Sequence, residues 1–363
     1  TNFWGDDGLY SLPALTAGDV VDVHSYGAAE SLSTNPKSEA NFIAWIGGAQ
    51  VVGRPLTITE WNVPPPARDR FTAPLYVAAI GALQGWDAPM LYAYSQDAVH
   101  DPMEQPKNVP IWSSWIDPSL TALAPAAAVM FRRGDVKPAT TTYVVELGRA
   151  NTYDRRRTAE DAPAIRTLVE QSRLFVELAD VKELDWDTRA ARPEGAKVVD
   201  LDRDALPDDA TSVRSDTGEI ERDWVTGVQT IDTPRSQAAI GWIGGRRIEL
   251  ADVRIDIATA KAAVVFTALD DQPLATSQRI LVTLVGRAGP GPDGSLPFRS
   301  EPIVGRIAIA SKAGELELVP LSGRSRGNAG DRVGLKRTTD GDHQVFEIPK
   351  DLVTHWYLLR PHR

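Results

Sequence analysis

Cysteine is absent from all 363 residues of the chain. The protein therefore has no disulfide bond, no thiolate nucleophile and no cysteine-ligated zinc, although a lack of cysteine does not place a protein inside or outside a cell. Histidine is also scarce, with five residues scattered along the sequence. We expect neither a histidine-rich metal centre nor a cofactor, while a Ca²⁺ ion held by aspartate and backbone oxygens in the second half of the chain stays open.

Long apolar runs are missing as well. A membrane-spanning helix needs roughly 18 uninterrupted apolar residues, but the most apolar run, Leu120 to Phe131, is shorter and contains Pro125. Basic residues are outnumbered, 39 against 49 acidic ones, which gives a formal charge of −10. This charge has the wrong sign for undirected attraction to DNA or anionic lipid. We therefore expect neither a membrane nor a nucleic acid as a partner.

Several short motifs are absent too. The sequence has no G-x-x-x-x-G-K-[ST] phosphate loop and no H-E-x-x-H zinc pair. It begins at Thr1 without a charged and then apolar leader, so we expect that any targeting segment has been removed. A secreted or periplasmic location is favoured, and the compartment is otherwise open.

The residues that are present are unevenly distributed. Six of the ten tryptophans lie within the first 133 residues. This segment alternates short runs rich in β-branched and aromatic residues with stretches of helical periodicity, which is the pattern of strand and helix units in a parallel sheet. The predicted strands cover residues 20–24, 55–61 and 90–95, and the predicted helices cover residues 38–47, 72–84 and 118–131.

From residue 134 onward, many short strands are separated by Gly, Pro and Asp turns, with one helix near residues 162–171. Apolar and charged residues alternate over residues 248–258, as in a sheet with one wet face. These features predict an antiparallel β-sandwich, with a surface loop over residues 180–222. We therefore predict an α/β domain over residues 1–133 and an all-β domain over residues 134–363, the latter a structural buttress in preference to an independent sugar binder.

Three residues stand at or near the ends of the predicted parallel strands: His24, Glu60 and Tyr94. In α/β barrels the C-terminal ends of the strands carry the active site, which makes Glu60 a candidate catalytic carboxylate. A carboxylate at this position is poorly explained as a residue that only faces solvent, because the strand before it, with Leu56 and Ile58, is expected to be buried. Capping of the strand, or an ion pair with an arginine such as Arg68, is the structural alternative for Glu60. A purely structural role is an equal alternative for His24.

Two short sequences resemble a known family. Residues 58–62, Ile-Thr-Glu-Trp-Asn, and residues 22–26, Asp-Val-His-Ser-Tyr, resemble the ends of strands seven and six in the clan of (β/α)8 glycoside hydrolases that includes family 5 cellulases. Residues 2–4 resemble the end of strand five, and Tyr92 and Tyr94 stand where strand eight supplies an aromatic floor, although the customary Trp is absent. The resemblance covers residues 1–133 and implies half of a TIM-type barrel, strands five to eight, followed by the β-sandwich.

The resemblance implies a retaining glycoside hydrolase that acts on β-linked glycosides in an oligo- or polysaccharide. One carboxylate attacks the anomeric carbon, and a second carboxyl group about 5 to 5.5 Å away protonates the leaving oxygen. Glu60 matches the nucleophile, and His24 and Tyr26 would hydrogen-bond to it. Ordinary core packing is the alternative role for each aromatic ring. The expected substrate-binding residues are Asn2, Trp4, Glu30, Trp61, Asn62, Tyr92, Tyr94 and Asp97.

The sequence departs from the family at the acid/base residue. That glutamate follows an asparagine at the end of strand four, but this chain has no Asn-Glu dipeptide and starts at what resembles strand five. A whole barrel takes about 250 residues, and an open half would expose a sheet edge and an apolar face. We therefore expect a complementary barrel half on another chain, a homo-oligomer that pairs its open sheets, or a smaller rearranged α/β domain.

Each of these three arrangements implies a different source for the missing acid/base residue. It would come from another chain, a partner subunit or a recruited loop carboxylate, with Glu30 and Asp97 the first candidates, although a solvated loop charge is the simpler role for each. Two other functions stay open. Loss of the acid would leave a non-catalytic glycan-binding or assembly protein. Hydrolysis of activated esters or aryl glycosides would need little help from an acid because the leaving group is good.

Overall fold

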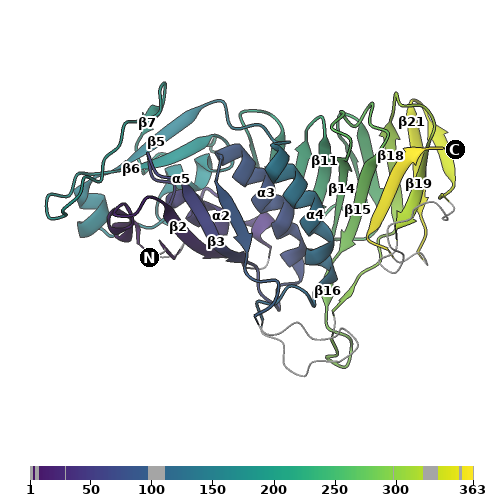
Figure 1. The fold of residues 1–363 in the computed structure, drawn as a ribbon, viewed down its shortest axis with the longest axis horizontal. Coiled ribbons are helices and arrows are strands. Elements are labelled where there is room, and N and C mark those ends of the chain that lie inside the picture. The colour runs from purple at the N-terminus through teal and green to yellow at the C-terminus, as the bar shows by residue number, and fades with distance from the viewer. Residues whose placement is uncertain are drawn as a thin grey trace.

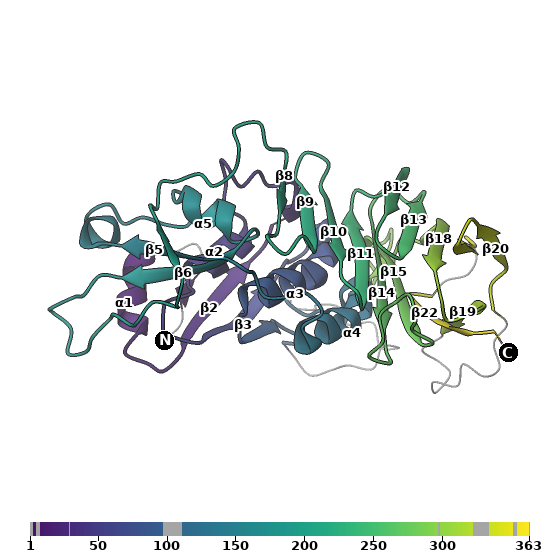
Figure 2. The same cartoon turned by 90° about the horizontal axis from the view of Figure 1, so that it is seen from above.

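The computed structural model describes residues 3–4, 8–28, 30–96, 111–296, 298–321, 334–350 and 354–362. These residues form two parallel sheets with their helices, two antiparallel sheets and a short two-stranded ribbon. The parallel sheets occupy one end of the molecule and the antiparallel sheets the other, with helices α3 (Ala73–Gln84) and α4 (Pro118–Arg133) between them (Figures 1 and 2). The predicted order, an α/β part followed by an antiparallel part, is confirmed.

The first sheet has four parallel strands in chain order: β1 (Phe3–Trp4), β2 (Val21–Tyr26), β3 (Leu56–Asn62) and β4 (Ala88–Leu91). The strands predicted over residues 20–24 and 55–61 are confirmed. The third covers Ala88–Leu91 instead of residues 90–95, because the backbone N–H of Ala93 already bonds to the carbonyl of Trp112 in a loop. In the described part of the chain β4 ends the sheet, and the strands do not close into a barrel.

Capping residues define the helices that pack on this sheet. Side chains of Asn41 and Asp117 accept hydrogen bonds from the first turns of α2 (Phe42–Gly48) and α4. Gly85 and Gly134 end α3 and α4 with φ of 71° and 64°, the left-handed region that favours glycine. All three predicted helices are confirmed within a few residues. The shorter helical elements are η1 (Leu9–Ser11), α1 (Leu12–Leu15), η2 (Ser31–Ser33), η3 (Arg68–Thr72) and η4 (Ala150–Asp154).

Helix α3 is buried on every side. It lies between the four-stranded sheet and the sandwich, so it has no solvent-facing stripe and its sequence is apolar all round. Among the helices of the described ranges, none is long and apolar enough to span a membrane.

A second parallel sheet follows, in the order β6 (Arg173–Leu178), β5 (Thr142–Leu147), β7 (Lys197–Val199), with helix α5 (Pro163–Leu168) between β5 and β6. Its apolar residues share a core with α2. The β-sandwich predicted from residue 134 onward therefore begins only at β8 (Ser212–Arg214). The strands β7 and β8 also replace part of the surface loop predicted over residues 180–222, because short strands can pair at a sheet edge without a long apolar run.

The sandwich consists of an eight-stranded and a five-stranded sheet, both antiparallel throughout. The larger sheet adds to β8 the strands β9 (Ile220–Asp223), β10 (Val228–Asp232), β11 (Ser236–Gly241), β14 (Ala262–Ala268), β15 (Ile280–Gly286), β22 (Trp356–Pro361) and β19 (Leu316–Leu321). The smaller sheet contains β12 (Arg246–Glu249), β13 (Val253–Ile257), β18 (Gly305–Ala310), β21 (His343–Ile348) and β20 (Arg337–Asp340), and the ribbon pairs β16 (Ala288–Gly289) with β17 (Arg299–Ser300).

The central strands of the larger sheet are covered on both faces. Every residue of β11 and β14 is buried. Along β14, Val265 belongs to the core that contains α3 and α4, whereas Val264 and Phe266 belong to the core between the two antiparallel sheets. Two buried faces explain why this strand is a continuous apolar run, while β13 alternates buried and charged residues.

Candidate functional site

A β-bulge in β3 determines which side chains meet on the open face of the four-stranded sheet. Asp22 pairs with Thr57 and His24 pairs with Glu60, so two steps along β2 match three along β3. The extra residue places Thr59 and Glu60 on the same half-exposed face, instead of alternating. Bulges commonly re-aim a side chain beside a functional site. The predicted candidate Glu60 is therefore presented by a local distortion of its strand.

The carboxylate of Glu60 is held through one oxygen. The hydroxyl of Tyr26 donates a hydrogen bond to Oε2, and Nδ1 of His24 lies 3.2 Å from the same atom. No contact to Oε1 is found among the described residues, and the Glu60 side chain is 24% exposed. Burial, with the hydrogen bond to Glu60 second, raises the pKa of Tyr26 above its ordinary value. The phenol therefore stays protonated and donates.

A second carboxylate, Asp22, lies near the other ring nitrogen of His24. Nε2 of His24 lies 3.1 Å from the hydroxyl oxygen of Thr59 and 3.6 Å from Oδ2 of Asp22. Asp22 accepts hydrogen bonds of 2.7 Å from the hydroxyls of Thr57 and Thr59. Sequence reasoning did not find the two threonines. Thr57 and Thr59 are two positions apart in a strand and therefore share a face, and this pattern beside the strand of Asp22 could have identified them.

An aromatic ring missed by the sequence analysis packs against the site. Trp112, in the loop before α4, lies with its ring centre 4.3 Å from that of Tyr26, at an interplanar angle of 41°. Tyr92 is half-buried, and its hydroxyl accepts a hydrogen bond of 3.2 Å from Gln96. Tyr94 is 62% exposed. The loop at the end of β4 thus carries two tyrosines with exposed surface, and the aromatic floor expected of them stays a prediction.

Two expected sugar contacts are instead interior. Asn62 is fully buried: its Nδ2 donates to the carbonyls of Tyr92 and Trp112, and its Oδ1 accepts from Arg70 at 3.1 Å. Trp61 is 6% exposed, because the bulge places it on the same buried face as Ile58. Neither side chain can reach a sugar at Glu60, so the sequence-based assignments of Asn62 and Trp61 are corrected.

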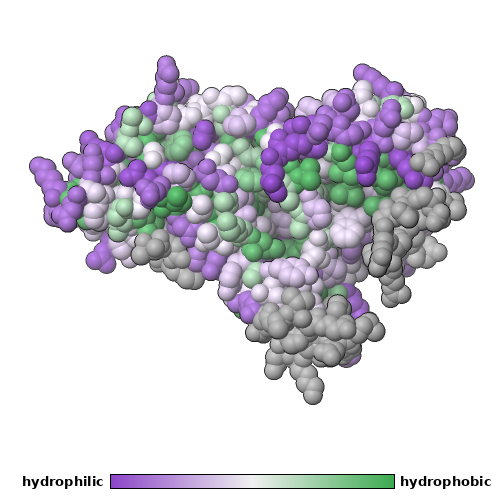
Figure 3. Space-filling view, viewed as in Figure 1, coloured by the Kyte–Doolittle hydropathy of each residue, from purple (hydrophilic) through white to green (hydrophobic). Residues whose placement is uncertain are grey.

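The ring of Trp61 lines a separate apolar cavity of about 420 Å³ between β4, α3 and α4. Apolar residues reach the surface in this central part of the molecule (Figure 3). The cavity has Phe131 and several alanines of α4 on its other side. Glu60 is not among the residues that line this cavity.

The remaining expected residues fall into two groups. Glu30 is bound to Lys261 of the sandwich, with Oε1 3.1 Å from Nζ, so it is an ion-pair partner and not a free acid. Arg68, the alternative partner of Glu60, is not in contact with that carboxylate. Asn2, Asp97 and the side chain of Trp4 lie outside the described residues.

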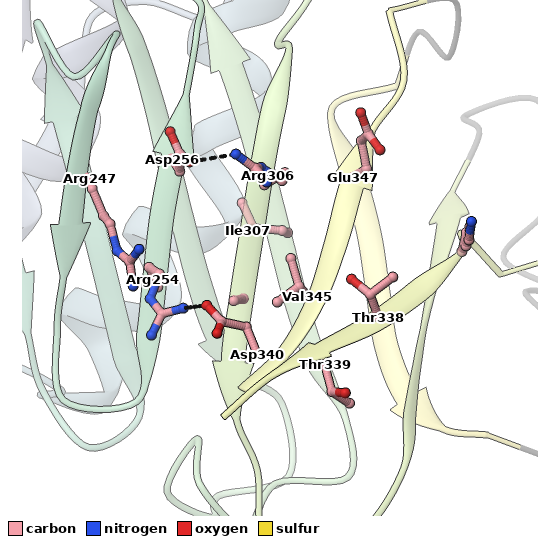
Figure 4. Close-up of a pocket in the computed structure, with 12 residues that line it drawn as sticks. Arg247, Arg254, Asp256, Arg306, Ile307, Thr338, Thr339, Asp340, Val345 and Glu347 are labelled. Carbon is pink, nitrogen blue, oxygen red and sulfur yellow. Dashed lines mark hydrogen bonds and ion pairs between the residues drawn. The ribbon is translucent and has the colours of Figure 1, made fainter. Parts of the chain in front are cut away.

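A groove of about 540 Å³ lies on the outer face of the five-stranded sheet (Figure 4). Two ion pairs of the sheet lie along it: Arg306 and Asp256 are 3.3 Å apart, and Arg254 and Asp340 are 2.6 Å apart. None of the described residues that line the groove is aromatic. The groove therefore offers no ring for a sugar to stack on, in keeping with a buttress role.

Comparison with known proteins adds no assignment. No protein-family profile matches the chain, and no match was found among curated proteins or among solved structures. Within the described residues, no group of three or more His, Asp or Glu side chains is arranged to hold a metal ion. The geometry around Glu60 is therefore the basis for a functional assignment.

Proposed function

We propose that the protein is a glycoside hydrolase that acts on β-linked glycosides with retention, with Glu60 as the nucleophile. The observation that carries the proposal is the asymmetry of this carboxylate. The Tyr26 hydroxyl donates to Oε2 and Nδ1 of His24 lies 3.2 Å from the same atom, while Oε1 has no partner in the described part of the chain. Contacts to one oxygen orient the group, and the other oxygen is left with its lone pairs available for attack.

The proposed reaction has two steps. Oε1 of Glu60 forms a bond to the anomeric carbon, the bond from that carbon to the leaving oxygen breaks, and an acid gives the leaving oxygen a proton. Water then attacks the anomeric carbon of the ester and releases Glu60, with the former acid accepting a proton from the water. Tyr26 and His24 hold Oε2 in both steps, first as a carboxylate oxygen and then as the carbonyl oxygen of the ester, and the rings of Trp112 and Tyr92 border the sugar.

The sheet supports the proposal of half a TIM-type barrel. Its four parallel strands follow chain order, whereas a doubly wound sheet reverses its order at a switch point. The polar face that carries Asp22, His24 and Glu60 corresponds to the barrel interior near the strand ends. In this interpretation a complementary half, on another chain or in a second copy of this one, completes the barrel.

Two carboxylates that could serve as the acid are already bound to other side chains. Asp22 is held by two threonine hydroxyls and Glu30 by Lys261. We therefore place the acid on a partner or on a loop carboxylate such as Asp97. The same observation favours the second candidate function, a glycan-binding protein without turnover, in which the aromatic residues bind sugar but no acid is present.

A mechanism-based label tests the nucleophile without needing the acid. A 2-deoxy-2-fluoro-β-glucoside with a dinitrophenolate leaving group should transfer its sugar to Glu60, releasing dinitrophenolate and leaving a stable ester. Mass spectrometry of peptides should place the added sugar on Glu60. The variant Glu60→Gln should release no dinitrophenolate while keeping the wild-type circular dichroism spectrum. A label on another residue would remove Glu60 from the mechanism, and binding without any label would favour the glycan-binding alternative.

A further inference from the structure

A groove of about 520 Å³ lies where the ends of β2 and β3 meet the sandwich. The two loops that form it are joined by a hydrogen bond of 2.8 Å from the backbone N–H of Gly27 to the carbonyl of Asn62. The groove therefore starts next to Tyr26 and Asn62, immediately beyond the Glu60 site. Its walls are Gly27, Ala28 and Glu30 after β2, residues 64–69 after β3, and Lys261 and Arg287 of the sandwich.

The groove is fixed by a buried cation. Lys261 is 4% exposed, and its Nζ donates to Oε1 of Glu30 at 3.1 Å and to Oδ2 of Asp69. The backbone of Glu30 has φ of 61°, a left-handed conformation that a residue with a side chain keeps only where its surroundings hold it. The loop after β2 is thus pinned to the sandwich, and the groove has one defined shape.

One positive charge in the groove is left without a partner. Lys261 is neutralised by two carboxylates, and Nη2 of Arg287 lies 2.7 Å from Oε1 of Glu301. Arg68 is exposed, and no hydrogen bond or ion pair of its side chain is found among the described residues. In a chain of net charge −10, this guanidinium is available to an anionic group of a ligand.

An exposed ring packs against Lys261, one of the residues that line the groove. Trp242 is 41% exposed, and the Lys261 ammonium lies 3.8 Å from its ring centre. The cation covers part of the indole and fixes its position, while the exposed remainder is the kind of surface on which sugar rings stack. The groove is thus lined by the exposed guanidinium of Arg68, and the lysine that fixes the groove also fixes an exposed indole.

We propose that this groove is a subsite for an acidic sugar, a uronic acid residue of a β-linked polysaccharide. Arg68 binds the sugar carboxylate and Trp242 contacts the ring. A guanidinium binds a carboxylate through two parallel, charge-assisted hydrogen bonds, which a neutral hydroxymethyl group cannot match. This inference rests on the proposed function and specifies its substrate class.

The test compares two tetrasaccharides that differ only at C6: β-1,4-linked glucuronic acid and β-1,4-linked glucose. Binding is measured by calorimetry with the full chain carrying Glu60→Gln, so that no turnover occurs. We expect the acidic probe to bind about tenfold more tightly, which corresponds to about 1.4 kcal/mol. Adding Arg68→Gln should abolish this difference without weakening the neutral probe, and Trp242→Ala should weaken both probes.

Arg189→Gln is the matched control, because this arginine is also exposed but lies in the loop between β6 and β7. It should leave both affinities unchanged. Equal binding of the two probes, or an equal loss of both with Arg68→Gln, would overturn the acidic subsite. If Glu60 is still labelled by the fluoroglycoside in that case, the proposed function stands. Failure of both probes to bind, together with no labelling, would remove both proposals.

Discussion

At the scale of single residues, the decisive contact is the one between Tyr26 and Glu60. A hydrogen bond to an ionised group contributes about 1.5–3 kcal/mol. Tyr26→Phe should therefore lower kcat/KM for an activated β-glycoside about 10- to 100-fold, because the carboxylate loses its donor and its orientation. Tyr10→Phe, at an exposed tyrosine, is the control and should be silent. An unchanged kcat/KM for Tyr26→Phe would show that the hydroxyl has no role in turnover.

The hydrogen bond from Tyr26 to Glu60 persists only while the tyrosine hydroxyl is protonated, so its contribution depends on pH. Burial, and then the hydrogen bond to Glu60, raises the pKa of Tyr26 above its ordinary value of 10.0. The donor is thus retained below that pH and lost only as the pH rises beyond it. The ratio of wild-type to Tyr26→Phe activity should therefore be constant from pH 7 to pH 10. A ratio that collapses within this range would contradict the assignment.

At the scale of elements, the bulge in β3 explains which site residues could be predicted. Strand ends and their order were readable from apolar runs bounded by Gly and Pro, and they bring His24, Tyr26 and Glu60 together as expected. A regular strand would place Glu60 on the same face as the buried Ile58 and would turn Trp61 to the other face. The extra residue reverses this. The position of the bulge depends on how β3 pairs with β2 and with β4. The sequence of β3 alone does not contain this information.

The end of β3 is held by one buried amide. Asn62 bonds to the carbonyls of Tyr92 and Trp112, to the backbone N–H of Val63 and to Arg70. Removing the amide leaves buried polar groups without partners, so Asn62→Ala should lower the free energy of unfolding by about 2–4 kcal/mol.

Urea denaturation measures this loss. The exposed Gln278→Ala is the control, with an expected change below about 0.5 kcal/mol. If Asn62→Ala unfolds at the wild-type urea concentration, the amide is not what holds the strand end.

At the scale of the whole molecule, a buried ion pair ties the α/β part to the sandwich. Arg222 of β9 is fully buried; its Nε donates to Glu170 at 2.7 Å, and its Nη1 donates to the carbonyls of Leu32 and Thr34. Arg222→Met should cost about 3–5 kcal/mol in unfolding free energy, because it leaves the Glu170 carboxylate buried and unpaired.

The double variant Arg222→Met with Glu170→Met separates charge burial from lost packing. It should recover a large part of the loss in urea denaturation, since no unpaired charge remains. A double variant no more stable than Arg222→Met alone would mean that the lost contacts to Leu32 and Thr34 dominate.

The division of the molecule was only partly readable from its sequence. The sandwich was predicted because β13 and its neighbours alternate apolar and charged residues. The parallel sheet of β5, β6 and β7 was missed, since β7 has only three residues and the pairings of β5 with β6 and β7 join segments more than 20 residues apart in sequence. Which face such a sheet buries depends on α2, an element far earlier in the chain.

The doubly covered strands β11 and β14 have a consequence for any truncation of the chain. These strands pack against helices on one face and against the smaller sheet on the other. Deleting the α/β part would therefore uncover a continuous apolar face of the larger sheet, of the kind that leads to aggregation.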